Sequence, residues 1–229
     1  MRTIITSILL STLLFMSSSG GFTPARADDD SENPTAKKEV KDTSLINAKP
    51  GVFTFASNSF KDGATLDMKY VFNSFGCSGK NVSPEFHWAN PPSGTKSFAL
   101  TMYDPDAPTG SGWWHWTVYN IPAKVMELRE GEKFTAYKKM NPETKKEEEI
   151  QFTGVGQGRT DFGKPGYGGP CPPEGEPHHY VFTLYAIKEA KLSLTKDSSG
   201  AMVGYMTNAN SIAKLSTTVM FGRSAAPTK

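Results

Sequence analysis

Histidine and cysteine are scarce in this chain of 229 residues, with four of the first and two of the second. The absence of H-E-x-x-H and C-x-x-C patterns removes the usual signatures of zinc hydrolases and thiol redox enzymes. A G-x-S-x-G nucleophile elbow is also missing, and "GVGQGR" lacks the strand–helix context of a dinucleotide site. Basic and acidic residues nearly balance, 25 to 23, without an arginine-rich run, so we expect no nucleic-acid partner.

Long apolar stretches are missing too, except at the N-terminus. Residues 1–27, "MRTIITSILLSTLLFMSSSGGFTPARA", open with Arg2, run apolar over 4–16 and end on Ala-Arg-Ala. This order of segments predicts a cleaved signal peptide, because the apolar run is short for a bilayer span. An uncleaved anchor helix is the alternative. We therefore expect a periplasmic or secreted protein without a transmembrane segment after cleavage.

The remaining chain divides into a leader and one domain. Residues 28–50 are polar and nearly free of aromatic side chains, which predicts a flexible leader, and the globular domain is expected over 51–229. Alternating or continuous apolar stretches predict strands; they lie at 52–57, 85–88, 97–103, 113–122, 178–187 and 217–222. The strand at 178–187 is apolar on both faces and should be central. The fold class expected is mainly β, a sandwich with one late helix.

Three further segments complete the pattern. The charged residues 123–150 predict an exposed excursion such as a hairpin, and the glycine- and proline-rich residues 154–177 exclude a helix or a central strand. Ser198 or Ser199 can cap a helix within 200–215. Apolar residues recur there at helical spacing, and we expect this stripe to face the core; it comprises Met202, Tyr205, Met206, Ala209 and Ala213.

The two cysteines, Cys77 and Cys171, have two possible states. Export implies an oxidising compartment, which favours a disulfide between them. Two free buried thiols are the alternative. Cys171 as a nucleophile beside His178 is a weaker possibility, because a disulfide would remove its thiolate.

Acidic and imidazole side chains gather near strand ends. The segment "YDPDAPTGSGWWHW" (103–116) contains Asp104 and Asp106. Three interpretations of these two residues are open: an acid/base pair, a metal site, or one pocket carboxylate with a structural neighbour. Side chains alternate along a strand, so His115 should point away from Trp114 and Trp116. The same alternation separates adjacent histidines and disfavours a metal site built from both.

In "PHHYVFTLYA" (177–186), alternation puts His178 on one face with Tyr180, and His179 on the other. Each strand therefore offers one histidine to a shared pocket. Strand ends that adjoin irregular loops are common positions for binding residues.

Four long blocks of the chain resemble the phosphatidylethanolamine-binding protein family, in its bacterial Raf-kinase-inhibitor-like branch of the YbhB/YbcL type. They are "FGCSGKNVSPEFHW", "YDPDAPTGSGWWHWTVYNIP", "TDFGKPGYGGPCPPEGEPHHYVFTLYAI" and "SSGAMVGYMTNANSIA", and the likeness extends from about Gly51 to Gly222. It implies a Greek-key β-sandwich with a short C-terminal helix and a small surface pocket that binds anions.

The resemblance also implies roles for individual residues. Asp104, His115 and His178 match the family's pocket aspartate and two pocket histidines, Asp106 and Pro108 match supporting residues, and Pro172 matches the pocket rim. The proposed disulfide would lie beside this pocket. Histidines that are partly charged near neutral pH would donate charge-assisted hydrogen bonds to a phosphate.

Three functions follow as hypotheses. The first is a non-enzymatic binding protein for phosphate, a phosphorylated small molecule or a phospholipid head group, with no cofactor and no metal. The alternative, implied by the family, is an inhibitor-like module whose target is a kinase or a protease. The third is a hydrolase that uses the Asp/His set; the absence of an identifiable nucleophile argues against it.

Overall fold

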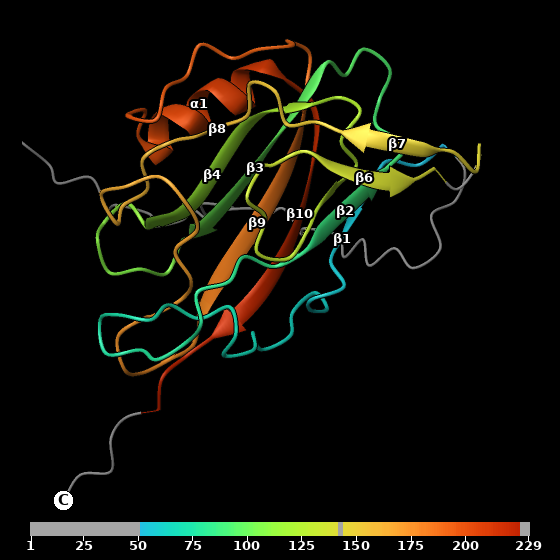
Figure 1. Ribbon diagram of the computed structural model, residues 1–229. Helices are drawn as coiled ribbons and strands as arrows, with labels where there is room; N and C mark the ends of the chain where they lie inside the picture. Colours follow the sequence, from blue (N-terminus) through green and yellow to red (C-terminus); the bar gives the residue numbers. More distant parts are fainter. Residues whose placement is uncertain (1–50, 142–143, 225–229) are drawn as a thin grey trace, which may run out of the picture. The chain divides into compact units, whose positions relative to one another are not determined.

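The computed structural model describes residues 51–141 and 144–224 (Figure 1). The predicted signal peptide at 1–27 and the predicted leader at 28–50 lie outside the described residues. In the part that is described, no helix has the length and apolar character needed to span a membrane. The elements, in chain order, are β1 (Thr54–Ala56), β2 (Phe86–Ala89), β3 (Ser97–Asp104), β4 (Trp113–Pro122), β5 (Glu127–Leu128), β6 (Tyr137–Met140), β7 (Glu147–Ile150), β8 (Gly156–Gln157), β9 (His178–Ile187), α1 (Gly200–Asn210) and β10 (Ser211–Phe221).

The strands form one large sheet and two small ones. The large sheet has the order β10-β9-β3-β4-β8, a second sheet has the order β1-β2-β5, and β6 pairs with β7. All the named pairings are antiparallel. Within the large sheet, β3, β4 and β8 lie side by side in chain order. The next strand of this sheet, β9, returns to pair with β3, which is a Greek-key arrangement. The expected mainly-β fold with one short helix is confirmed.

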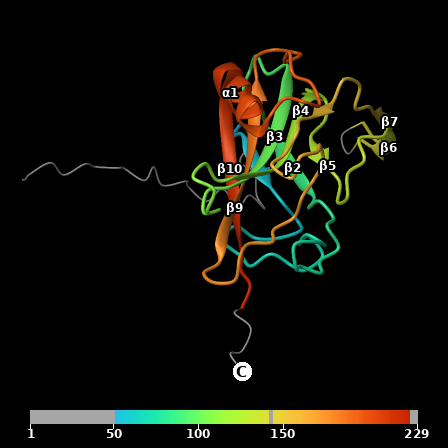
Figure 2. The same cartoon turned by 90° about the vertical axis from the view of Figure 1, so that its left-hand side faces the viewer.

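The main core lies between the large sheet and the three-stranded sheet β1-β2-β5. Phe55, Phe86 and Leu128 from the small sheet pack with Leu100 and Phe182 from the large one, and all five side chains are almost fully buried. In Figure 2 the sheets are seen edge on, with β2 and β5 beside the large sheet. A second, smaller core covers the other face of the large sheet beneath α1. The result is a sandwich with one helix outside it.

Most of the predicted strands are confirmed. The segments predicted at 97–103, 113–122 and 178–187 are β3, β4 and β9, and β9 is central because it pairs on both sides with β10 and β3. The charged excursion contains the β6–β7 hairpin (Figure 1). The glycine- and proline-rich segment contributes only β8, a two-residue strand at the sheet edge.

The prediction for the helix was partly wrong. Ser199 is the N-cap, and its hydroxyl accepts a hydrogen bond from the backbone N–H of Met202 at 3.2 Å. The helix ends at Asn210, however, and the residues that follow begin β10. Most of the predicted apolar stripe does not face the core, because Met202 and Tyr205 are 49% and 70% exposed and only Met206 of the stripe packs against the second core.

Small residues make up the buried face of α1 instead: Gly200, Val203, Gly204 and Thr207. The indole of Trp114 on β4 occupies the space beside both glycines. A Cβ on Gly200 would lie 2.2 Å from Trp114 Cγ, and one on Gly204 would lie 2.9 Å from its Cη2. Close approach of the helix to a tryptophan therefore decides which face is buried.

Candidate functional site

Three strand ends meet at the candidate site. Asp104 is the last residue of β3, and it pairs with Trp113, the first residue of β4. His178 is the first residue of β9, which lies on the other side of β3. A cavity of about 230 Å³ opens here. Its lining comprises Phe75, Asp104, Ala107, Pro108, Thr109, Trp113, His115, Phe162, Cys171, Pro172, Pro173, His178 and Tyr180.

Asp104 forms the fixed point of the cavity. Its side chain is nearly inaccessible, and Oδ1 accepts hydrogen bonds from the backbone N–H groups of Asp106 (2.9 Å) and Ala107 (3.0 Å). The other oxygen, Oδ2, lies 2.8 Å from Nδ1 of His178, which donates to it. The intervening proline restricts the turn that presents the two amides. The carboxylate therefore orients the imidazole of His178 and has no freedom to move into the cavity.

A β-bulge determines where His115 points. Met102 pairs with Trp116 and Tyr103 pairs with Trp114, so His115 is left without a partner on β3. A bulged residue breaks the alternation of side chains along its strand. Trp114 packs on α1, whereas Trp116 belongs to the core between the sheets. The predicted common face for the two tryptophans is therefore wrong.

His115 lies on the pocket side of the sheet, as predicted from its opposition to Trp114. Its ring stands edge-on to Phe162 and Tyr180, with centroids 5.3 and 5.1 Å away. The ring is buried, and Nδ1 lies 2.7 Å from the carbonyl oxygen of Gly168. Because a carbonyl only accepts, Nδ1 carries the proton, and Nε2 of the neutral ring is an acceptor.

Burial changes the protonation of His115. Desolvation lowers its pKa to about 4, although the hydrogen bond to Gly168 and the Asp104 charge act in the opposite direction. The expectation of a partly charged ring near neutral pH therefore does not hold for His115. An anion entering the cavity would have to bring or recruit a proton to make this ring a second donor.

The paired histidines separate as predicted. His178 lines the cavity, while His179 lies outside that lining, 54% exposed, with its Nδ1 and backbone N–H both 2.7 Å from Oδ2 of Asp106. Burial by itself raises the pKa of Asp106, but these bonds hold it below its ordinary value. Asp106 is not a lining residue, and its carboxylate is engaged by His179 outside the cavity.

Tyr180 is a lining residue that the sequence reasoning did not identify. Its side chain is fully buried, and its hydroxyl lies close to the Asp104 carboxylate without a hydrogen bond of good geometry to any described residue. Burial and the nearby Asp104 charge raise its pKa well above the ordinary value, so the hydroxyl keeps its proton. An unsatisfied buried donor usually has a functional or solvent partner. Its alternation with His178 on β9 was the available signal.

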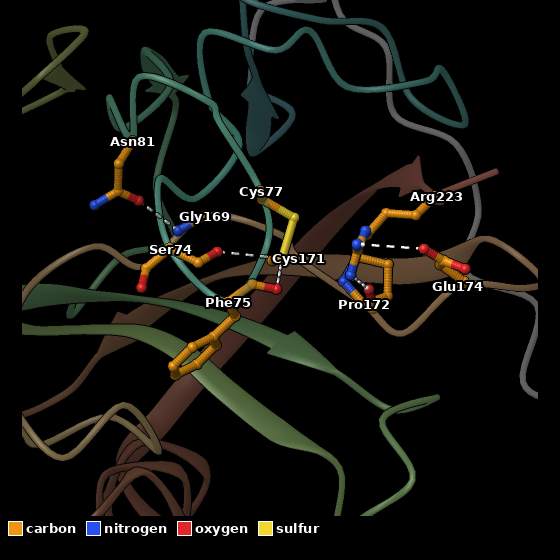
Figure 3. Close-up of a disulfide and its surroundings, with 9 residues drawn as sticks. All are labelled: Ser74, Phe75, Cys77, Asn81, Gly169, Cys171, Pro172, Glu174 and Arg223. Atoms are coloured by element: carbon orange, nitrogen blue, oxygen red, sulfur yellow. Dashed lines mark hydrogen bonds and ion pairs between the residues drawn. A yellow bond between two sulfur atoms is a disulfide. The ribbon is translucent and has the colours of Figure 1, made fainter. Parts of the chain in front are cut away.

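The disulfide between Cys77 and Cys171 is present, with an S–S distance of 2.04 Å (Figure 3). The prediction of a bridge is confirmed, and the two alternatives, free thiols and a Cys171 nucleophile, are excluded by it. Cys171, Pro172 and Pro108 all line the cavity, where the bridge contributes part of the wall. Across the described ranges, no three His, Cys, Asp or Glu side chains are arranged to hold a metal ion.

Comparison with known proteins gives a consistent assignment. Residues 56–222 match the family model described as phosphatidylethanolamine-binding protein. The UPF0098 proteins YbcL and YbhB of Escherichia coli K12 are 48% and 46% identical to this chain. The matches cover 77% and 72% of this chain and 91% and 97% of the two relatives.

Solved structures agree with the sequences. The crystal structure of E. coli YbcL, described as a member of the mammalian PEBP family, superposes with a TM-score of 0.65, covering 75% of this chain and 98% of that one. A putative homologue from Chlamydia trachomatis, 26% identical, gives a TM-score of 0.59 over 76% of this chain and 99% of its own. This chain therefore belongs to the phosphatidylethanolamine-binding protein family.

Proposed function

We propose that the cavity binds a phosphate group, either free or as the phosphorylated head group of a small molecule or lipid, and that no chemical turnover follows. The observation that carries this proposal is the convergence of His115, His178 and Tyr180 around one buried carboxylate. With Nδ1 committed to Asp104, a protonated His178 offers Nε2–H to an anion. Tyr180 offers its hydroxyl. His115 adds a third donor when it takes up a proton.

The absence of turnover rests on the chemistry of the lining. Asp104 is held by three hydrogen bonds, and Cys171 is in a disulfide, so neither is an available nucleophile. The cavity is also smaller than the roughly 300–1,000 Å³ of drug-sized ligand pockets. It suits a head group better than a complete lipid.

Calorimetric titration with O-phosphoethanolamine and inorganic phosphate tests the proposal. The double variant His115→Ala, His178→Ala removes two of the three donors, and we expect a loss of affinity of at least about 100-fold, or about 3 kcal/mol. His179→Ala is the matched control, because that histidine lies outside the cavity lining; its affinity should stay within about twofold. Unchanged affinity in a folded double variant would refute the assignment.

The pH dependence gives an independent check. Because His115 is neutral in the free protein, binding should take up a proton, and affinity should fall as the pH rises from 5 to 8. Methyl sulfate serves as the reference ligand, since its charge is constant in this range. A methyl sulfate affinity that does not vary with pH would contradict the role given to His115.

The place of action is part of the proposal. A disulfide at the pocket wall favours an oxidising compartment, so we place the mature protein in the periplasm or outside the cell. Cell fractionation with a C-terminal tag tests this, and a cytoplasmic location would contradict it.

If a kinase or protease is captured equally by the wild type and the double histidine variant, an inhibitor-like function that does not use the pocket is favoured instead.

A further inference from the structure

Two chain segments form the outer wall of the cavity, and they are tied together near their bases. The backbone N–H of Phe72 donates to the carbonyl of Pro170 at 3.0 Å. Asn81 accepts from the N–H of Gly169 at 2.7 Å (Figure 3). Its side-chain amide also donates to the carbonyl of Tyr167 at 3.2 Å. These bonds are independent of the cysteines. They fix both ends of the loop 72–81 whether or not the disulfide is present.

The apex of this loop is held differently. Cys77 is bonded to Cys171, whose Sγ lies 3.5 Å from the carbonyl oxygens of Ser74 and Phe75 (Figure 3). Arg223 packs against Gly76, where an added Cβ would lie 3.2 Å from the guanidinium. The disulfide is the one covalent link in this contact, so it sets where the apex lies.

Phe75 is the residue that the apex presents. Its side chain is 64% exposed and yet lines the cavity, with ring centroids 5.4 Å from Phe72 and 5.9 Å from Phe162. Its φ of 56° lies in the left-handed region, which is unfavourable for a residue with a large side chain. Such a conformation persists when the surroundings impose it. The turn 74–77 supplies that constraint: the backbone N–H of Cys77 donates to the carbonyl of Ser74 at 3.0 Å, and the bridge ties the end of the turn to Cys171.

The wall and the floor of the cavity have different chemistry. The floor carries the polar groups of Asp104, His115 and His178 beside Tyr180, whereas the outer wall is aromatic and prolyl; the wall comprises Phe75, Trp113, Phe162, Pro108, Pro172 and Pro173. A lone phosphate would occupy the floor and leave this wall in contact with water. A phosphate ester with an apolar substituent would contact both.

We infer that Phe75 is a specificity-determining residue that selects phosphate esters bearing an apolar chain, and that the Cys77–Cys171 disulfide positions it. This inference rests on the proposed anion-binding function. The floor provides affinity for the phosphate, and Phe75 provides additional affinity for the apolar chain. Reduction of the bridge then weakens this additional affinity without removing the phosphate site, because the base of the loop has its own hydrogen bonds.

Two probes separate these contributions: methyl phosphate and hexyl phosphate. The quantity measured by titration is the ratio of their affinities, which we expect to exceed about tenfold in the wild type. Phe75→Ala should lower this ratio at least about fivefold and leave methyl phosphate affinity within about twofold. Met140→Ala, which truncates a 59% exposed side chain on β6 outside the lining, should change neither value.

The role of the disulfide is tested with Cys77→Ser, Cys171→Ser in combination. This variant should lower the ratio as much as Phe75→Ala does, and adding Phe75→Ala to it should have little further effect. A ratio that is unchanged in Phe75→Ala, which keeps the bridge, overturns the inference while methyl phosphate binding preserves the proposed function. Failure of both phosphate esters to bind the wild type overturns the inference and the proposed function together. If the ratio is lowered in Phe75→Ala but not in the double cysteine variant, only the part of the inference assigned to the disulfide is overturned.

Discussion

His115 makes the stability of the domain depend on pH in a way that one substitution can isolate. The unfolded ring titrates near its ordinary pKa of 6.5, whereas burial lowers the folded value to about 4. Between these values the unfolded chain binds a proton that the folded chain does not. The contribution is therefore most favourable above pH 6.5 and is lost as the pH falls towards 4.

The magnitude follows from the difference between the two pKa values, about 2.5. At about 1.4 kcal/mol per pH unit, the free energy of unfolding should decrease by about 3 kcal/mol between pH 7.5 and pH 4 through this residue. His115→Asn cannot titrate, and its amide remains able to donate to the Gly168 carbonyl. The variant should therefore lack this part of the pH dependence.

Urea unfolding followed by tryptophan fluorescence at several pH values provides the measurement. Carboxylates contribute equally to both proteins, so the difference between wild type and His115→Asn reports on His115. That difference should change by about 3 kcal/mol over the range. Parallel curves for His115→Asn and the wild type would show that desolvation does not control this ring.

Three substitutions test the packing around the site by thermal or urea unfolding. Gly200→Ala places a methyl group 2.2 Å from the indole of Trp114 and should destabilise by about 1–3 kcal/mol, and an unaffected midpoint would contradict the close packing of α1. Ser199→Ala removes the N-cap and should cost about 1 kcal/mol, which Ser199→Asp should restore. Replacing Cys77 and Cys171 by serine opens a link between residues 94 apart and should cost up to about 4–5 kcal/mol, while a loss below 1 kcal/mol would show that the unfolded chain is already compact.

The long strands could be predicted because their apolar patterns are strong. On β9, the pairing with β10 continues without a break from Tyr185 to His178, so alternation placed His178 and His179 on opposite faces. On β4 the same reasoning failed for Trp116, which was expected on the face of Trp114, because a bulge is not visible in hydropathy. The pocket histidine was nevertheless identified, since both its opposition to Trp114 and the family resemblance pointed to it.

The helix shows a different limit. Hydropathy ranks Met202 and Tyr205 as core residues, but the space available against Trp114 admits only Gly200 and Gly204. Steric fit between distant segments decided the buried face, and no local pattern contains that information. Phe75 was missed for a related reason: it is an ordinary apolar position locally, and only the fold brings it to the cavity. Tyr180 was missed although its alternation with His178 placed it on the pocket face of β9.

The bulge at His115 also has a consequence for how this protein can vary among its relatives. At this bulge β4 has one residue more than β3, so the direction of the imidazole depends on the number of residues in the strand as well as on the contacts of the ring. Insertion of a single residue between Trp113 and Trp116 would change this register, and with it the side of the sheet that the ring faces, even if every side chain of the segment were retained. The β6–β7 hairpin contributes nothing to the cavity lining and carries no such restriction on its length.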